Sequence, residues 1–139
     1  MTELQFEKHQ KLLSVKEIEK RIRNLNEQIY MLTESEYSPQ VQQLKSNSTG
    51  GSGTTEKDLS DYIVKLEQLN TKLVREKSAL VRKRCEILDA ISKLHENEAA
   101  IIEELYILQW SVTKISRENN YSPRQIFRIR NKALDNIEI

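Results

Sequence analysis

Arginine, glutamine and asparagine side chains follow a strong helix start near the end of the chain. Ser122-Pro123-Arg124-Gln125 places a serine at the N-cap, a proline at the first helical position and a glutamine three residues after the cap. The apolar positions of such a helix share one face: Ile126, Ile129, Ala133 and Ile137. The side chains turned away from that face are Arg124, Gln125, Phe127, Arg128, Asn131 and Lys132. Arginine can donate two hydrogen bonds to guanine, and glutamine or asparagine can pair with adenine, in the major groove of DNA.

Two shorter helical patterns precede this helix and are expected to position it. The first covers 99–110, and its expected core positions are Ala100, Ile101, Leu105, Leu108 and Trp110. The second covers 112–119, with Val112 and Ile115 pointing inward and Lys114 and Arg117 pointing outward. We expect a tight turn at Asn119-Asn120-Tyr121, because asparagine tolerates the left-handed backbone. Three short helices within about forty residues have the size of a small trihelical DNA-binding unit.

Charge is distributed unevenly along a chain whose totals nearly cancel, with 22 basic and 21 acidic residues among 139. The last segment carries more basic than acidic residues: Lys114, Arg117, Arg124, Arg128, Arg130 and Lys132 against Glu118, Asp135 and Glu138. The preceding segment is acidic, with Glu96, Glu98, Glu103 and Glu104. We expect this acidic face to point away from phosphate, which leaves the last helix towards DNA.

The first two thirds of the chain show heptad spacing instead. A helix over about 4–32 carries a seam of Val15, Ile18, Ile22, Leu25, Ile29 and Leu32. The pattern stops at 34–57, where the polar run 46–55 contains all three glycines and predicts a flexible connection, natural or engineered. A second helix is expected from Asp58 or Ser60 to about Leu94. Its apolar stripe is Leu59, Tyr62, Ile63, Leu66, Leu69, Leu73, Leu80, Ile87, Ile91 and Leu94.

Polar residues interrupt one line of this second seam at Asn70, Lys77 and Arg84. A polar seam residue costs stability but restricts register and partner number. The sequence therefore predicts an all-α protein, with a long antiparallel coiled-coil hairpin over 1–95 that serves self-association as a dimer or larger homo-oligomer. A three-helix helix-turn-helix DNA-binding domain is expected over 96–139.

The last third of the chain resembles a known family. Leu105-Tyr106-Ile107, Ile115-Ser116, the run from Tyr121 to Ile129 and Lys132-Ala133-Leu134 resemble the region-4 helix-turn-helix of sigma factors. More closely, they resemble the phage and prophage late-gene activators of the RinA and ArpU type, which join a helical N-terminal half to such a unit. The sequence departs from the family at Lys114, which stands before Ile115-Ser116 where an acidic residue is usual.

The resemblance implies roles for individual side chains. The helix that opens at Ser122 would enter the major groove, with base edges facing Arg124, Gln125, Phe127 and Arg128. Asn131 joins this group as a further outward polar side chain. Phosphate contacts are assigned to Lys114, Arg117, Tyr121, Ser122 and Lys132. For Phe127, two interpretations stay open: contact with a thymine methyl group, or packing on a neighbouring helix.

Catalysis finds no support in the sequence. His9 and His95 lie far apart, no metal-ligand spacing accompanies Cys85, and no glycine-rich phosphate loop precedes a helix. We therefore expect no enzyme, no cofactor and no metal site. No apolar run approaches the length of a membrane span and no leader is evident, so we expect a cytoplasmic protein. The resemblance to phage activators implies that the cell is a bacterial host.

Three functions stay open at this point. The first is a sequence-specific regulator that binds double-stranded DNA, with RNA polymerase as a further candidate partner of an activator. The second is a phage DNA-packaging subunit of the small-terminase kind, which an assembly of eight or more subunits would favour over two to four. The third is a structural coiled-coil adaptor, which would show no salt-sensitive DNA binding.

Overall fold

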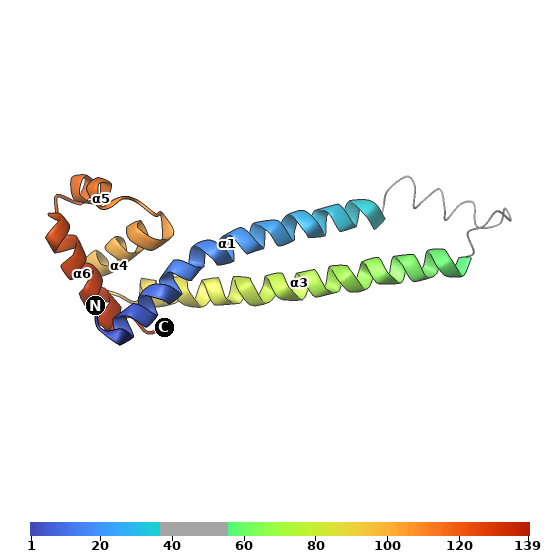
Figure 1. The fold of residues 1–139 in the computed structure, drawn as a ribbon, viewed down its shortest axis with the longest axis horizontal. Helices are drawn as coiled ribbons and strands as arrows, with labels where there is room; N and C mark the ends of the chain where they lie inside the picture. The colour runs from blue at the N-terminus through green and yellow to red at the C-terminus, as the bar shows by residue number, and fades with distance from the viewer. Residues whose placement is uncertain (37–55) are drawn as a thin grey trace. The chain divides into compact units, whose positions relative to one another are not determined.

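The structure is a computed structural model that describes residues 1–36 and 56–139, and these contain helices and no strand. The predicted all-α class is confirmed. The helices are α1 (Glu3–Glu36), α3 (Glu56–Ser92), α4 (Glu96–Ile102), the π-helical turn η1 (Glu103–Ile107), α5 (Val112–Asn119) and α6 (Pro123–Asn136) (Figure 1). The predicted flexible stretch at 34–57 lies outside the described residues except at its two ends, where α1 and α3 reach into it.

The chain divides into two compact units. The terminal unit contains Met1–Lys20 and Val81–Ile139, and the arm unit contains Arg21–Leu80. The terminal unit thus includes the first turns of α1 and the end of α3 as well as the segment expected to form the C-terminal domain. The domain boundary at residue 95 stays a prediction, because the contacts that define the terminal unit cross it.

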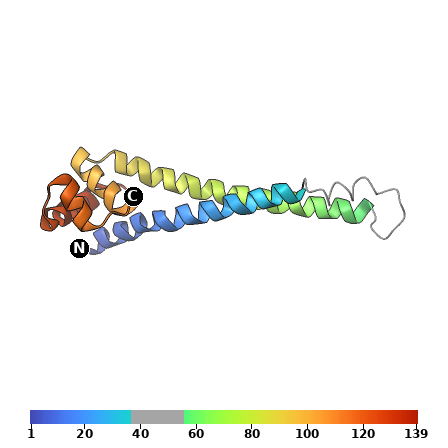
Figure 2. The same cartoon turned by 90° about the horizontal axis from the view of Figure 1, so that it is seen from above.

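In the arm unit, α1 and α3 lie side by side (Figures 1 and 2). Ile22 and Leu25 of the predicted α1 seam are buried, as is Leu73 of α3. An ion pair joins the two helices, with Arg21 Nη2 donating to Glu76 Oε1 at 2.8 Å. Two helices that pack along a single seam bury little of their apolar surface. Tyr62, which belongs to the predicted apolar stripe of α3, is 46% exposed.

The polar interruptions of the α3 seam are half-buried, as a seam position requires. Asn70, Lys77 and Arg84 all have intermediate exposure. Asn70 Oδ1 and Arg84 Nε are enclosed and find no hydrogen-bond partner among residues 1–36 and 56–139. Because an enclosed polar atom without a partner is costly, Asn70 and Arg84 are expected to lower the stability of the helix pairing.

The core of the terminal unit joins α4, α5 and α6. Ile101, Ile115 and Ile126, one from each helix, have no exposed surface. Partly buried apolar side chains pack around them: Leu105, Trp110, Val112, Tyr121 and Ile129. Each buried isoleucine contributes roughly 1.5 to 3 kcal/mol relative to exposure, so this cluster holds the three short helices together. Ile102 is buried as well, which shows that α4 is covered on two adjacent sides.

The predicted helix over 99–110 is confirmed as far as Ile107, but it is not one regular α-helix, because α4 changes to the π-helical turn η1 at Glu103. A π turn inserts about one extra residue per turn and rotates everything after it around the helix axis. Tyr106 is therefore buried, at 4% exposure, whereas the predicted core residue Leu108 is 56% exposed. The π-helical turn ends at Ile107, and two residues further on Gln109 adopts a φ of 58°, in the left-handed region.

Candidate nucleic-acid interface

The start of α6 confirms the predicted helix-start motif. Ser122 Oγ accepts a hydrogen bond from the backbone nitrogen of Gln125 at 3.2 Å, and Gln125 Oε1 accepts one from the backbone nitrogen of Ser122 at 2.9 Å. Pro123 occupies the first turn, where a missing amide hydrogen has no cost. This reciprocal cap satisfies two backbone donors that the helix cannot pair internally, so the first turn of α6 is fixed.

The turn before α6 also forms as predicted. The bounds of α5 agree with the predicted 112–119, and Asn120 adopts the left-handed conformation with φ 57° and ψ 33°. Ser116 Oγ donates a hydrogen bond to the backbone oxygen of Tyr121, which closes the turn from the α5 side. The hydroxyl group of Ser116 therefore stabilises the turn between α5 and α6.

One face of α6 anchors the helix in the terminal unit. Ile126, Ala133 and Ile137 of the predicted apolar face are buried, and Ile129 is half-buried. Leu134 was not predicted and is fully buried too. The anchoring face is therefore wider than the sequence pattern indicated, and its burial fixes which side chains turn outward.

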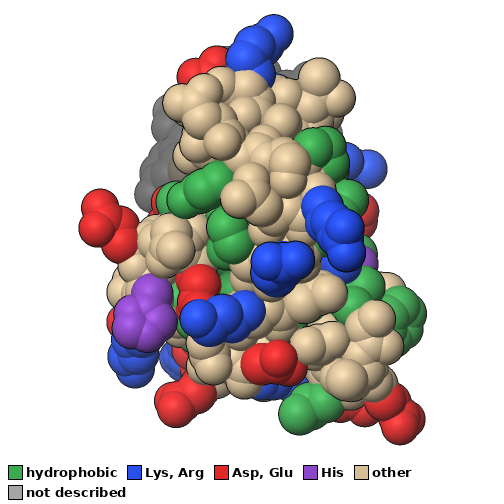
Figure 3. Space-filling model, turned by 90° about the vertical axis from the view of Figure 1, so that its left-hand side faces the viewer, with side chains coloured by type: hydrophobic (Ala, Val, Ile, Leu, Met, Phe, Trp, Pro, Cys, Tyr) green, Lys and Arg blue, Asp and Glu red, His purple; other side chains and the backbone are tan. Residues whose placement is uncertain are grey.

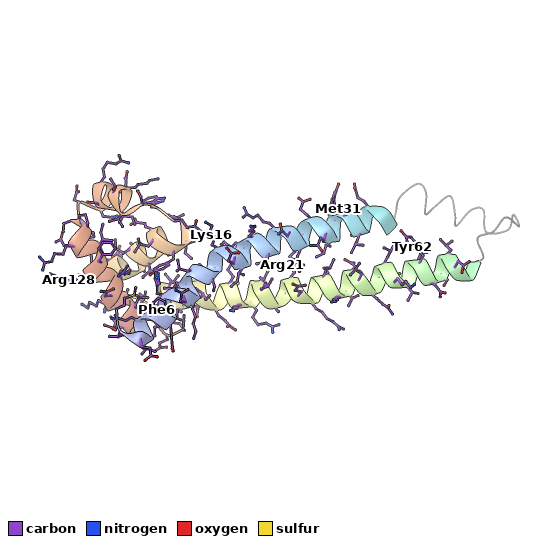
Figure 4. All side chains as sticks on the ribbon, viewed as in Figure 1. Phe6, Lys16, Arg21, Met31, Tyr62 and Arg128 are labelled. Atoms are coloured by element: carbon purple, nitrogen blue, oxygen red, sulfur yellow. The ribbon has the colours of Figure 1, made fainter. Side chains whose placement is uncertain are left out.

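Three basic side chains line the outward face of α6. Arg124, Arg128 and Lys132 follow one another at four-residue spacing, so they lie on successive turns of the same face. All three are exposed, and within the described part of the chain none of them makes a hydrogen bond or an ion pair. Figure 4 shows Arg128 extending outward from α6, and Figure 3 shows a group of Lys and Arg side chains on this side of the terminal unit.

Two other side chains predicted to read bases are exposed, but each already contacts a neighbouring residue. Gln125 is exposed, yet its side-chain oxygen is used in the cap, which leaves only its NH₂ group free to donate. Phe127 is 40% exposed, and the Arg130 guanidinium lies over its ring, 4.9 Å from the centroid. An adenine contact by Gln125 would need both ends of the amide, so the cap and the contact compete for the same oxygen.

Asn131 lies apart from the exposed group. It is half-buried, and its Oδ1 accepts hydrogen bonds from Arg130 Nε at 3.2 Å and Nη2 at 3.0 Å. Its backbone oxygen accepts a further hydrogen bond from Gln5 at 3.3 Å. Asn131 therefore faces the α1 side of the terminal unit.

Of the residues predicted to contact phosphate, some are exposed and unpaired in the described ranges, and others are partly buried or already hydrogen-bonded. Arg117 is exposed on α5 and, like the α6 arginines, has no hydrogen-bond or ion-pair partner among the residues described. Lys114 is half-buried, with Nζ 4.2 Å from the centroid of the Trp110 ring, a cation–π contact. Tyr121 is half-buried against the core, and the exposed Ser122 uses its hydroxyl in the cap.

The expectation that the acidic side chains all face away from the basic surface is wrong for Glu98. A hollow of about 450 Å³ lies beside α6, lined by His95, Asn97, Glu98, Arg128, Ile129 and Lys132. Glu98 is only 3% exposed, and both its oxygens accept from the Asn136 amide at 3.3 Å. Glu98 is buried because α4 packs on α6 at this position. The spacing of residues along the sequence does not reveal such a contact between two helices.

The sequence interpretation missed the start of α1. Gln5 is buried, at 7% exposure, and contacts α6 across a separation of 126 to 130 residues. Thr2 and Gln5 form a reciprocal cap, with bonds of 2.9 and 3.2 Å between each side chain and the other residue's backbone nitrogen. The Thr-x-x-Gln spacing is the signal that could have identified this helix start, although not its contact with α6.

No protein-family model matches this chain, and neither does any curated protein or solved structure. In the described ranges, no three His, Cys, Asp or Glu side chains are grouped to hold a metal ion. No helix there combines the length and apolar character needed to cross a membrane. The arrangement of exposed cations on α6 therefore carries the functional interpretation.

Proposed function

We propose that this protein is a sequence-specific regulator of transcription that binds double-stranded DNA through α6. In this proposal α5, the turn at Asn120 and α6 act as a helix-turn-helix. The observation that carries it is the exposed row of Arg124, Arg128 and Lys132 on a helix whose opposite face is buried; these three have no hydrogen-bond or ion-pair partner among residues 1–36 and 56–139. A row of unpaired positive charges would be attracted by the negative phosphates that flank a DNA groove.

The spacing of the row suits a helix lying in the major groove. Four residues of an α-helix rise about 6 Å, and the groove of about 12 Å admits a helix with its side chains. We assign base reading to Arg124 and Arg128, and phosphate contacts to Lys132 and to Arg117 of α5. Base contacts would give specificity, whereas phosphate contacts would set position and supply affinity for any sequence.

The arm unit is proposed to mediate self-association. We infer that α1 and α3 form a coiled-coil hairpin, and that a second copy covers apolar surface on the arm such as Tyr62 and Leu69, 46% and 45% exposed. Two copies would place two helices of the α6 type on half-sites about one turn of DNA apart. The proposed setting is the cytoplasm of a phage-carrying bacterium, where RNA polymerase would be the partner of an activator.

The test is a comparison of DNA affinities. Duplexes selected from a random pool by the parent protein and duplexes of scrambled sequence are measured at one fixed salt concentration. Arg124→Ala or Arg128→Ala should weaken binding to the selected site by about 1 to 3 kcal/mol and relax one base preference. Lys132→Ala should weaken binding to both duplexes similarly.

Arg75→Ala is the matched control, because Arg75 is an exposed arginine on α3. It should bind both duplexes like the parent. If the two α6 arginine variants also bind the selected site like the parent, base reading by α6 is wrong. A parent protein with no salt-sensitive DNA binding would select the adaptor function instead.

A further inference from the structure

The first turns of α1 hold the C-terminal half of α6 through a buried glutamine. Gln5 Nε2 donates to Asp135 Oδ1 at 2.7 Å and to the backbone oxygen of Asn131 at 3.3 Å. At the other end of the same amide, Oε1 accepts from the backbone nitrogen of Thr2 at 2.9 Å. Both ends of this buried amide are therefore satisfied, and the bond to a carboxylate is of the stronger, charge-assisted kind.

A lysine from α1 completes the end of α6. The last turn of α6 contains no basic side chain of its own. Lys8 Nζ donates to the backbone oxygen of Ile137 at 2.7 Å and reaches that of Asp135 at 3.5 Å. A cation beside the final carbonyl groups of a helix stabilises its negative end, so α1 supplies what α6 lacks.

A third contact joins α1 to the π-helical turn. His9 Nδ1 lies 2.5 Å from the Tyr106 hydroxyl, and the two rings meet edge to face with centroids 5.4 Å apart. Gln5, Lys8 and His9 thus occupy one stretch of α1 that contacts both the end of α6 and the segment following α4. The grouping of Met1–Lys20 with Val81–Ile139 in one compact unit agrees with these contacts.

The geometry points to a positioning role for Gln5: we propose that the first turns of α1 fix the direction of α6, so that its outward arginines meet base edges correctly. This inference rests on the proposed function. The cap at Ser122 fixes one end of α6, and Gln5 with Lys8 fixes the other. Side chains that read bases must be held within about 0.5 Å and 10–20°, whereas phosphate contacts tolerate more movement.

The test uses a substitution that removes the one nitrogen from which both bonds to α6 are donated. Gln5→Glu keeps the acceptor for Thr2 but removes the donor and places a carboxylate beside Asp135. Amide hydrogen exchange in residues 132–137 should become about tenfold faster. Affinity for the selected duplex should fall about tenfold, while affinity for a scrambled duplex should change less than twofold.

Two further variants make the test specific. Adding Asp135→Asn to Gln5→Glu reverses donor and acceptor between residues 5 and 135, and should restore part of the slow exchange and part of the discrimination, since only the bond to the Asn131 backbone oxygen stays lost. Gln10→Glu introduces the same charge at an exposed position of α1 and should leave both unchanged. If Gln5→Glu prevents folding, Lys8→Met tests the same idea by removing the contact with the end of α6.

Parent-like discrimination by Gln5→Glu, or by Lys8→Met, would overturn the positioning role, whatever the exchange rates. Exchange that is unchanged in both variants would equally contradict it. Failure of the parent itself to bind DNA would instead overturn the proposed function, and the exchange measurement would still decide whether α1 holds α6.

Discussion

The terminal unit and the arm unit use similar residues in different ways. In the terminal unit, isoleucines from three short helices meet and have no exposed surface. In the arm unit, two long helices meet along one seam, and Tyr62 and Leu69 keep nearly half of their surface exposed. Short helices are marginal alone, so the terminal unit depends on its core, whereas the arm leaves apolar side chains exposed.

Arginines in the two units show the same contrast. Arg21 of the arm is paired with Glu76 at 2.8 Å, whereas Arg128 of α6 has no partner in the described ranges. An exposed pair is largely neutralised and contributes little, but an unpaired row of cations produces a field that reaches beyond the surface. Lack of a partner does not by itself mark a binding surface, because Arg23 and Arg75 of the arm are also exposed and have no hydrogen-bond or ion-pair partner in the described ranges. What distinguishes α6 is the row of three such side chains on a helix whose opposite face is buried, and our proposal rests on that row.

Removing a core side chain of the terminal unit should have the largest effect. Ile126→Ala should lower the free energy of unfolding by about 2 to 5 kcal/mol, because a fully buried isoleucine leaves a cavity. The neighbouring Phe127→Ala, at a position 40% exposed, should cost less than about 1 kcal/mol. Denaturant unfolding checks both, and equal losses would contradict the described anchoring of α6.

The next largest effect is expected when exposed apolar residues of the arm are replaced by polar ones, which should prevent the proposed self-association. With Tyr62→Gln and Leu69→Gln together, light scattering should give the mass of one chain, against two to four chains for the parent. Leu88→Gln, at an apolar position of α3 that is 37% exposed and belongs to the terminal unit, serves as control. A parent assembly of eight or more chains would favour the packaging function, and an unchanged mass in the double variant would show that the arm surface is not the interface.

A smaller effect is expected from pH. Burial lowers the pKa of His9, and the charge of Arg130 lowers it further; burial raises the pKa of its partner Tyr106, and Arg130 opposes that rise. The unfolded chain, with His9 near 6.5, then binds a proton more readily than the folded one. Stability should be fully present above pH 6.5 and decrease as the pH falls through the folded pKa of His9.

Thermal unfolding between pH 5 and 7.5 checks this prediction. His9→Gln should flatten the pH dependence, because the group that takes up the proton is gone. His95→Gln changes an exposed histidine of the same unit and should leave the slope as it is. A parent-like slope in His9→Gln would assign the pH dependence to other groups.

The smallest effect should come from the ion pair of the arm. The Arg21 and Glu76 side chains are 45% and 40% exposed, so water and salt screen them. Arg21→Gln should change the free energy of unfolding by no more than about 1 kcal/mol, measured at low and at high salt. A larger loss would mean that the pair does more for the arm than its exposure indicates.

Local patterns predicted much of this fold, because their causes are local. The cap at Ser122 and the left-handed Asn120 depend on residues within one or two helical turns, and both form as predicted. Four residues of the predicted α1 seam are buried: Val15, Ile18, Ile22 and Leu25. The exposure of Arg124 and Arg128 followed from the opposite apolar face. Such features are decided by backbone geometry and periodicity, which the sequence shows directly.

Features that depend on distant contacts could not be predicted. The π turn exposes Leu108 and buries Tyr106, which reaches His9 about a hundred residues earlier. The contact of Gln5 with α6 and the burial of Glu98 have the same cause, because both depend on packing between segments that are distant in the sequence. Gln125 shows another limit, since one side chain matched two roles in the sequence and its oxygen serves the cap in the structure.

A tethered cleavage experiment tests most directly whether α6 lies in the groove. In a chain with Cys85→Ser, a cysteine introduced by Lys132→Cys carries an iron chelate that cuts DNA nearby, and the parent labelled at the exposed Cys85 is the control. The account predicts cuts confined to the selected site, staggered between the strands as a major-groove position requires. Binding without cuts above those of the Cys85 control would contradict it.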